Sequence, residues 1–151
     1  MICRPTTEQI LLDCSRVLQD LVGAVSDETA QVRIAMLQKV LQNAAARSAH
    51  ETAWMIDEIT GIEAYGHAVH AATGAGGVHA ALADLAAHPV GSLHLDDVAG
   101  SYARASDLLS LSLEAALEAQ RADLVGEGES LLNARLDHEN QIVGGWDAVG
   151  R

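Results

Sequence analysis

The chain is poor in the aromatic and basic residues that build many protein cores and most nucleic-acid-binding surfaces. It contains no Phe, two Trp, two Tyr and a single Lys, Lys39. Without Phe, the core must consist of Leu, Ile, Val, Met and Ala, and such small side chains let helices approach one another closely. Nine Lys and Arg against 21 Asp and Glu give a formal net charge of −12. Nucleic acids and anionic membranes are therefore not expected partners, because binding either requires cationic side chains.

Cysteine and long apolar runs are also scarce. The two cysteines, Cys3 and Cys14, lie far apart, and no Cys-x-x-Cys occurs. Two such thiols do not make a disulfide framework, so we expect both to be reduced, with Cys14 on a core face. No basic-then-apolar leader opens the sequence, and no apolar run approaches the roughly 18 residues of a membrane span. These absences favour a cytoplasmic protein.

What the chain does have is a globular, helix-favouring composition. Of its 151 residues, 49% are hydrophobic and 20% charged, with much of the apolar share contributed by Ala. This length suits one domain, 1–151. No segment alternates with period two, so no sheet is expected. The fold prediction is all-α, an up-and-down helical bundle of about four long helices plus one or two short ones.

The N-terminal part predicts an antiparallel helical hairpin. Thr6 followed by Gln9 matches a capping box, and Ser26 and Asp27 supply a cap for the next helix after a very short connection. In both helices apolar residues recur every three to four positions, which predicts faces that pack inward. The first face is Ile10, Leu11, Cys14, Val17, Leu18, Leu21, Val22 and Val25, and the second is Ile34, Leu37, Leu41, Ala44 and Ala45.

The remaining helices are predicted from caps, glycines and apolar spacing. Ser48 and Glu51 match a second capping box, which favours a break and a new helix ending near Thr73. A short helix is expected over Val78–His88, and a long one from about Leu95 to Val125. Glycines are expected to end the last two helices, at Gly126, Gly128, Gly144 and Gly145.

The candidate metal site consists of Glu63, His67 and His70. Offsets of four and three residues place these side chains on one helix face, where imidazole and carboxylate could hold a divalent metal with a further ligand from another element. The alternative is a solvated polar stripe. The other histidines lie on separate segments, and nothing in the sequence says which of them would meet: His50, His79, His88, His94 and His138.

Part of the N-terminal third resembles a known family. Arg4-Pro5-Thr6, Ile10-Leu11, Val17-Leu18 and Arg33-Ile34-Ala35 resemble a family of small uncharacterised bacterial helical proteins. These proteins are often encoded beside aminoglycoside-phosphotransferase-like kinases and acyl-CoA dehydrogenases. The resemblance implies an accessory subunit of a metabolic enzyme system and carries over no catalytic residue and no cofactor.

The sequence holds no nucleophile motif and no phosphate-binding loop. The leading hypothesis is therefore a non-catalytic accessory or protein-interaction subunit. A mean hydropathy of +0.12 also favours a homodimer, formed through the helix around Leu108 to Leu117. One alternative is a metal-binding bundle or metal-dependent enzyme using Glu63, His67 and His70. Another is a small-molecule cavity lined by Trp54, Met55 and Tyr65.

Overall fold

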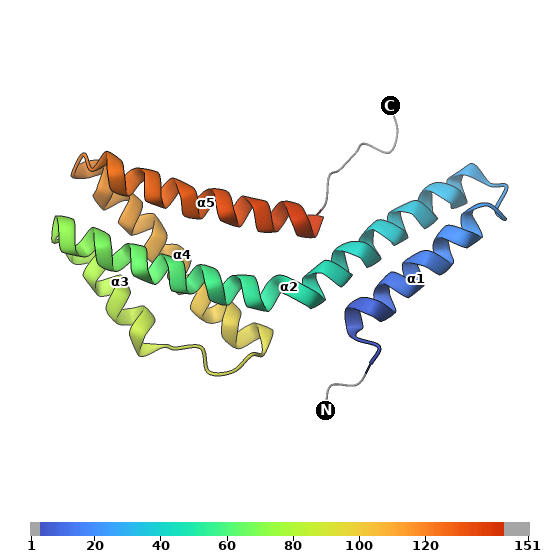
Figure 1. Ribbon diagram of the computed structural model, residues 1–151, viewed down its shortest axis with the longest axis horizontal. Coiled ribbons are helices and arrows are strands. Elements are labelled where there is room, and N and C mark those ends of the chain that lie inside the picture. The colour runs from blue at the N-terminus through green and yellow to red at the C-terminus, as the bar shows by residue number, and fades with distance from the viewer. Residues whose placement is uncertain (1–3, 144–151) are drawn as a thin grey trace. The chain divides into compact units, whose positions relative to one another are not determined.

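The computed structural model describes residues 4–143, and every regular element in that range is a helix (Figure 1). The all-α prediction is confirmed. The five helices are α1 (Thr7–Val22), α2 (Glu28–Thr73), α3 (Gly76–Ala87), α4 (Leu95–Glu118) and α5 (Ala122–Val143). The predicted helix ends at Gly144 and Gly145, like Cys3, lie outside the described residues.

The contacts divide the chain into two compact units, and α2 contributes to both. Unit 1 comprises 1–51 with 139–151, and unit 2 comprises 52–138. In unit 1, α1 lies beside the first half of α2 as a helical hairpin (Figure 1). In unit 2, the second half of α2 packs with α3, α4 and most of α5. The prediction of a single domain over 1–151 stays a prediction.

The predicted start of each hairpin helix is confirmed. The Thr6 backbone N–H donates to Gln9 Oε1 at 2.9 Å, and the Gln9 backbone N–H donates to Thr6 Oγ1 at 3.2 Å, so the capping box is complete. Ahead of α2, Asp27 Oδ1 accepts from the Thr29 backbone N–H at 2.9 Å. Both caps satisfy backbone donors that a helix N-terminus leaves unpaired, and they depend only on residues three apart or fewer.

The predicted helix break at Ser48 is wrong, because α2 runs without interruption from Glu28 to Thr73. Ser48 Oγ donates back to the Ala45 carbonyl at 2.8 Å, and Glu51 pairs with Arg47 at 3.1 Å. The two residues of the apparent capping box therefore find partners inside the helix. The predicted end at Thr73 is confirmed, and Gly74 follows it with a positive φ of 69°, a conformation that glycine adopts without strain.

The predicted end of the long helix at Gly126 is also wrong. Helix α4 stops at Glu118, and Gln120 adopts the left-handed conformation with φ of 54°. The Arg121 N–H donates to the Ala116 carbonyl and the Gln120 N–H to the Leu117 carbonyl, each at 3.0 Å. This is the Schellman arrangement that satisfies the last carbonyls of a helix. Gly126 lies inside α5 instead.

Unit 2 holds the main hydrophobic core. Its buried side chains come from all four of its helical segments and include Ile59, Ile62, Tyr65, Val69, Val78, Leu82, Leu85, Val98, Ala105, Leu108, Leu109, Ala116 and Leu124. Two glycines allow close helix contacts. A Cβ at Gly66 would lie 2.9 Å from Leu108 Cδ1, and one at Gly128 would lie 2.8 Å from Tyr65 Oη. Gly128 therefore packs α5 onto the core rather than ending a helix.

Candidate functional site

The structure places the three predicted metal ligands on one helix but in different surroundings. Glu63 is half-buried, His67 is exposed and His70 is half-buried. The His70 ring stacks on His79 with centroids 4.9 Å apart, and its Nδ1 lies 3.3 Å from the Ala75 carbonyl oxygen. Within residues 4–143, no group of three or more His, Cys, Asp or Glu is arranged to hold a metal ion. The metal hypothesis stays a prediction that needs a direct metal measurement.

The structure brings a different set of polar side chains together in unit 2. Glu58 on α2 lies at the centre, and its side chain is 11% exposed. Tyr102 Oη on α4 donates to Glu58 Oε2 at 2.5 Å. From α5, His138 Nδ1 lies 2.7 Å from Glu58 Oε1, and Arg135 Nε lies 3.5 Å from Glu58 Oε2. We call these side chains, with Ser106 and Trp54, the Glu58 cluster.

Arg135 is the second organising residue of the Glu58 cluster. Its Nε donates to Tyr102 Oη, and its Nη2 donates to Ser106 Oγ at 2.7 Å. The guanidinium carbon also lies 4.4 Å from the centroid of the Tyr102 ring, which adds a cation–π contact. Ser106 Oγ donates in turn to the Tyr102 carbonyl at 2.9 Å. Arg135 thus links α5 to one turn of α4 through two side chains, Tyr102 and Ser106.

His138 is held on two sides. Its ring stacks on Trp54 with centroids 4.6 Å apart and an interplanar angle of 4°. An ionised carboxylate only accepts hydrogen bonds, so the Nδ1 facing Glu58 carries the proton. A histidine whose Nδ1 is fixed by a carboxylate has a defined tautomer and ring orientation. The cluster therefore positions His138, with Nε2 as the nitrogen that does not face Glu58.

The tyrosine of the cluster is held in its neutral form. Burial and the hydrogen bond to Glu58 raise the pKa of Tyr102 to about 12, and the nearby Arg135 opposes that rise. A phenol with such a pKa stays protonated near neutral pH and acts as a donor to Glu58. Tyr102 therefore serves as a hydrogen-bonding link between the carboxylate and the guanidinium. It is not placed to act as a base.

Sequence reasoning missed the Glu58 cluster, because its members are far apart along the chain. Glu58 and His138 are separated by 80 positions and Glu58 and Tyr102 by 44. The sequence does not say which of the scattered histidines meet, and the structure places the 25% exposed side chain of His138 against Glu58. No local sequence motif predicts such a cluster. The one available signal was Arg135 and His138, which are three apart and so share a face of α5.

The residues of the predicted small-molecule cavity do not converge on one another. Trp54 stacks on His138, whereas Tyr65 is buried in the core of unit 2, where its hydroxyl has no hydrogen-bond partner within the described residues. Burial is the main cause that raises the pKa of Tyr65, followed by Glu127. Met55 packs against the edge of the same core.

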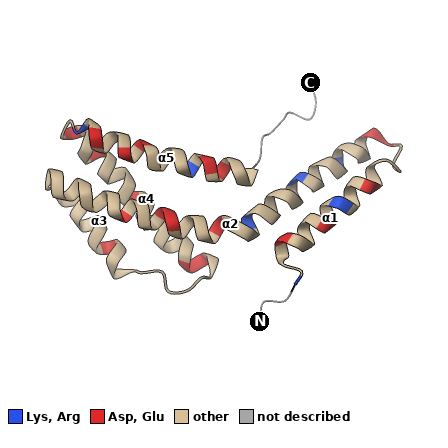
Figure 2. Cartoon of the chain, in the orientation of Figure 1, with Lys and Arg blue, Asp and Glu red and all other residues tan. Residues whose placement is uncertain are grey.

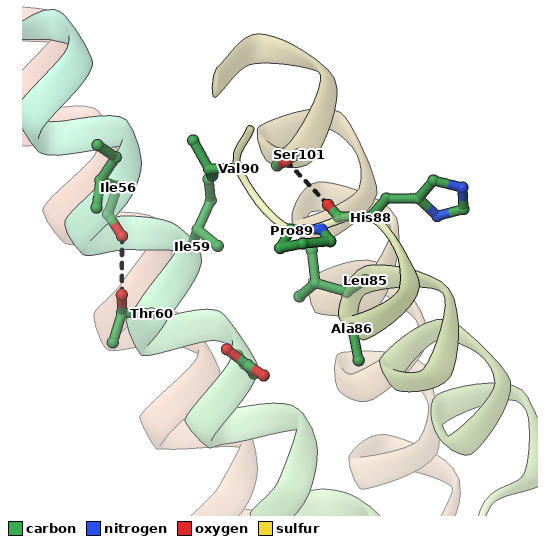
Figure 3. Close-up of a pocket in the computed structure, with 10 residues that line it drawn as sticks. Ile56, Ile59, Thr60, Leu85, Ala86, His88, Pro89, Val90 and Ser101 are labelled. Atoms are coloured by element: carbon green, nitrogen blue, oxygen red, sulfur yellow. Dashed lines mark hydrogen bonds between the residues drawn. The ribbon is translucent and has the colours of Figure 1, made fainter. Parts of the chain in front are cut away.

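A separate cavity of about 410 Å³ lies among α2, α3, the connection after α3 and α4 (Figure 3). Its walls are mostly apolar, and Glu63 is among the residues that line it. Thr60 Oγ1 donates to the Ile56 carbonyl at 3.0 Å and Ser101 Oγ to the His88 carbonyl at 3.1 Å. The His88 ring points away from the cavity (Figure 3). Since the backbone already uses both hydroxyls, the cavity presents few groups for chemistry.

The third feature is the hairpin of unit 1, whose helices are joined by hydrogen bonds between polar side chains. Gln38 Nε2 on α2 donates to the Ser15 carbonyl at 3.2 Å and to Gln19 Oε1 at 2.8 Å. Gln42 Nε2 donates to Ser15 Oγ at 3.5 Å. Within the described part of the hairpin, the buried residues are Ser15, Gln38 and Ala45. Ser and Gln are residue types that folded proteins mostly leave exposed, so their burial here is unusual.

The predicted inward face of α1 is confirmed only in part: Leu11, Leu18, Val22 and Val25 are half-buried, and the other four members are exposed. Ile10, Val17 and Leu21 are exposed, and Cys14 is an exposed free thiol. Ser15 follows Cys14 and faces α2, where its carbonyl accepts from Gln38. Cys14 and the residues in line with it on α1 therefore face away from α2. We call the resulting surface the hairpin face. It consists of Ile10, Cys14, Val17 and Leu21 on α1, with Leu37, Val40, Leu41 and Ala44 on α2.

Comparison of the chain with models of protein families, with curated proteins and with solved structures finds no match. The N-terminal resemblance stays a prediction. No helix within residues 4–143 is long and apolar enough to cross a membrane. The polar groups of the Glu58 cluster are paired with one another, so their arrangement supports positioning of helices. Within residues 4–143, the hairpin face is an apolar surface whose members Ile10, Val17, Leu21, Leu37 and Val40 are exposed.

Proposed function

We propose that the chain is a non-catalytic protein-interaction subunit and that the hairpin face is its docking surface. The observation that carries the proposal comes from unit 1, where Ser15 and Gln38 are buried while Val17 and Leu37 are more than half exposed. Contiguous apolar surface of this kind costs free energy in water and marks interaction sites on proteins.

The Glu58 cluster fits a supporting role in this proposal. Its carboxylate, phenol, guanidinium and imidazole are satisfied by one another, and such networks fix the geometry of a bundle. An accessory role beside a metabolic enzyme, which the N-terminal resemblance implies, suits a chain that acts through contacts. The helix segment suggested earlier for a homodimer has its main stripe inside unit 2, because Leu108 and Leu109 are buried.

Site-specific photo-crosslinking in the native host tests the proposal. A photoreactive amino acid replaces Val17 or Leu37 on the hairpin face in one pair of strains, and Val32 in a control strain. Val32 is also exposed, but it lies five positions from Leu37, about 140° around the helix. We expect one discrete crosslinked product from Val17 and Leu37 and none from Val32. The absence of any product at both face positions would contradict the proposal.

A further inference from the structure

The two apolar stripes of the hairpin lie on the same side of it. Ser15 and Gln38 mark the direction in which each helix faces the other. Cys14 and Leu37 each precede one of these residues, and one step along a helix turns the side chain by about 100°. Because α1 and α2 are antiparallel (Figure 1), one step back on each turns both side chains to the same side. The hairpin face is therefore continuous across both helices.

The spacing within each stripe is that of helix-packing positions. On α1 the members follow at intervals of four, three and four residues, and on α2 Leu37, Leu41 and Ala44 follow at four and three. These are the intervals by which side chains of one helix interlock with those of another in four-helix bundles. A hairpin carrying such a face on one side supplies half of a four-helix bundle.

The exposed apolar area supplies the larger part of what one partner contributes to a standard interface. Five members of the face are exposed large hydrophobic residues: Ile10, Val17, Leu21, Leu37 and Val40. Together they leave roughly 500 Å² in water, more than half of the about 800 Å² that each partner contributes to a standard protein interface. Half-buried Leu41 and the exposed Cys14 extend the face further.

The charges of the two helices indicate which partner fits the hairpin face. Helix α1 carries three acidic residues and one Arg, a net charge of −2, whereas the described stretch 28–51 of α2 carries three basic residues and two Glu, a net charge of +1. Figure 2 shows basic residues recurring along the first half of α2. A second hairpin placed with its α1 on this α2 matches opposite charges at both contacts, because the arrangement is reciprocal.

We propose that a second copy of this chain covers the hairpin face, with α1 of each copy packed on α2 of the other. This inference rests on the proposed function and names the docking partner. The contact closes with twofold symmetry, so both copies bury the same residues and the hairpin face is used up in the pair. The result is a four-helix bundle built from two hairpins.

Light scattering coupled to size-exclusion chromatography tests the inference on the full chain. At tens of micromolar we expect twice the 15.8 kDa mass of one chain. Val17→Glu and Leu37→Glu each place a charge in the contact and should weaken dimerisation about 100-fold or more, giving monomers. Val32→Glu is the matched control and should stay dimeric. A monomeric wild-type chain, or a dimer unaffected by both face variants, would overturn the proposal.

A mixing experiment tests the arrangement of the helices. Val17→Glu and Leu37→Lys chains are each expected to be monomeric, and an equimolar mixture should form a mixed dimer, because the Glu of one α1 then faces the Lys of the other α2. A mixture that stays monomeric would overturn the pairing of α1 with α2. Circular dichroism checks that each variant keeps its helix content, as we expect since Val17 is 58% and Leu37 54% exposed.

The crosslinking experiment separates this inference from the proposed function. A product that contains only peptides of this chain, at twice its mass, supports the second copy as the occupant. A product that contains another protein overturns the dimer and leaves the interaction role intact. If neither the Val17 position nor the Leu37 position gives a crosslinked product, both the dimer and the proposed interaction role are contradicted.

Discussion

Replacing Glu58 with Gln removes one charge from the centre of the Glu58 cluster while keeping the shape of the side chain. In the native protein the carboxylate accepts from Tyr102 at 2.5 Å and faces His138 Nδ1 at 2.7 Å and Arg135 Nε at 3.5 Å. A neutral amide has one acceptor oxygen where the carboxylate has two, and it no longer offsets the charge of Arg135.

The expected loss follows from the two hydrogen bonds that involve the ionised carboxylate. Hydrogen bonds to charged groups contribute about 1.5–3 kcal/mol, against about 0.5–1.5 kcal/mol for neutral ones. Changing both from charged to neutral should therefore lower the free energy of unfolding by about 2 kcal/mol. For a chain of this size the melting temperature should fall by about 4–8 °C.

The assay is urea unfolding followed by circular dichroism at pH 7, with Asp57→Asn as the control. Asp57 is the adjacent residue, is exposed and also loses one negative charge when changed to Asn. A surface change of this kind should alter stability by less than about 0.5 kcal/mol. If Glu58→Gln and Asp57→Asn give the same unfolding midpoint, the Glu58 cluster does not stabilise unit 2, and the reasoning is refuted.

Three further predictions follow. Gly128→Ala should lower stability by about 1–2 kcal/mol because the added methyl overpacks the core, whereas Gly126→Ala, with nothing within 4 Å, should raise it by about 1 kcal/mol; equal unfolding midpoints would contradict the packing argument. Because the pKa of Tyr102 is raised to about 12, its contribution is complete below about pH 10 and is lost as the pH rises toward 12. The difference in urea midpoint between wild type and Tyr102→Phe should shrink over that range. A constant difference would contradict the raised pKa of Tyr102. The predicted metal site is tested by metal analysis of protein purified without an affinity tag, which should find stoichiometric metal in the wild type and none in His67→Ala. Wild-type protein without metal would contradict the metal hypothesis.

The features predicted correctly from the sequence depend on nearest neighbours. The capping box of Thr6 and Gln9 forms because its two hydrogen bonds involve only residues three apart. The end of α2 at Thr73 follows from the glycines after it. Helix content was likewise predictable, since Ala, Leu and Glu favour helix wherever they lie.

The errors arose where a residue has two possible partners. Ser48 can cap a helix or donate to a carbonyl three residues earlier, and only the tertiary structure decides between these. Gly128 can end a helix or admit a neighbouring side chain, and here it admits Tyr65 and Leu113. The Glu58 cluster could not be predicted, because it needs three helices to be placed before Glu58, Tyr102 and Arg135 meet.

The stack of Trp54 on His138 gives the protein an intrinsic optical probe. An imidazole ring at 4.6 Å and nearly parallel to an indole quenches its fluorescence by electron transfer, and more strongly once the imidazole is protonated. Emission from Trp54 should therefore brighten and shift to longer wavelength when α5 leaves α2. With Trp146 changed to Phe, Trp54 is the remaining indole, so its emission reports when α5 detaches without any attached dye.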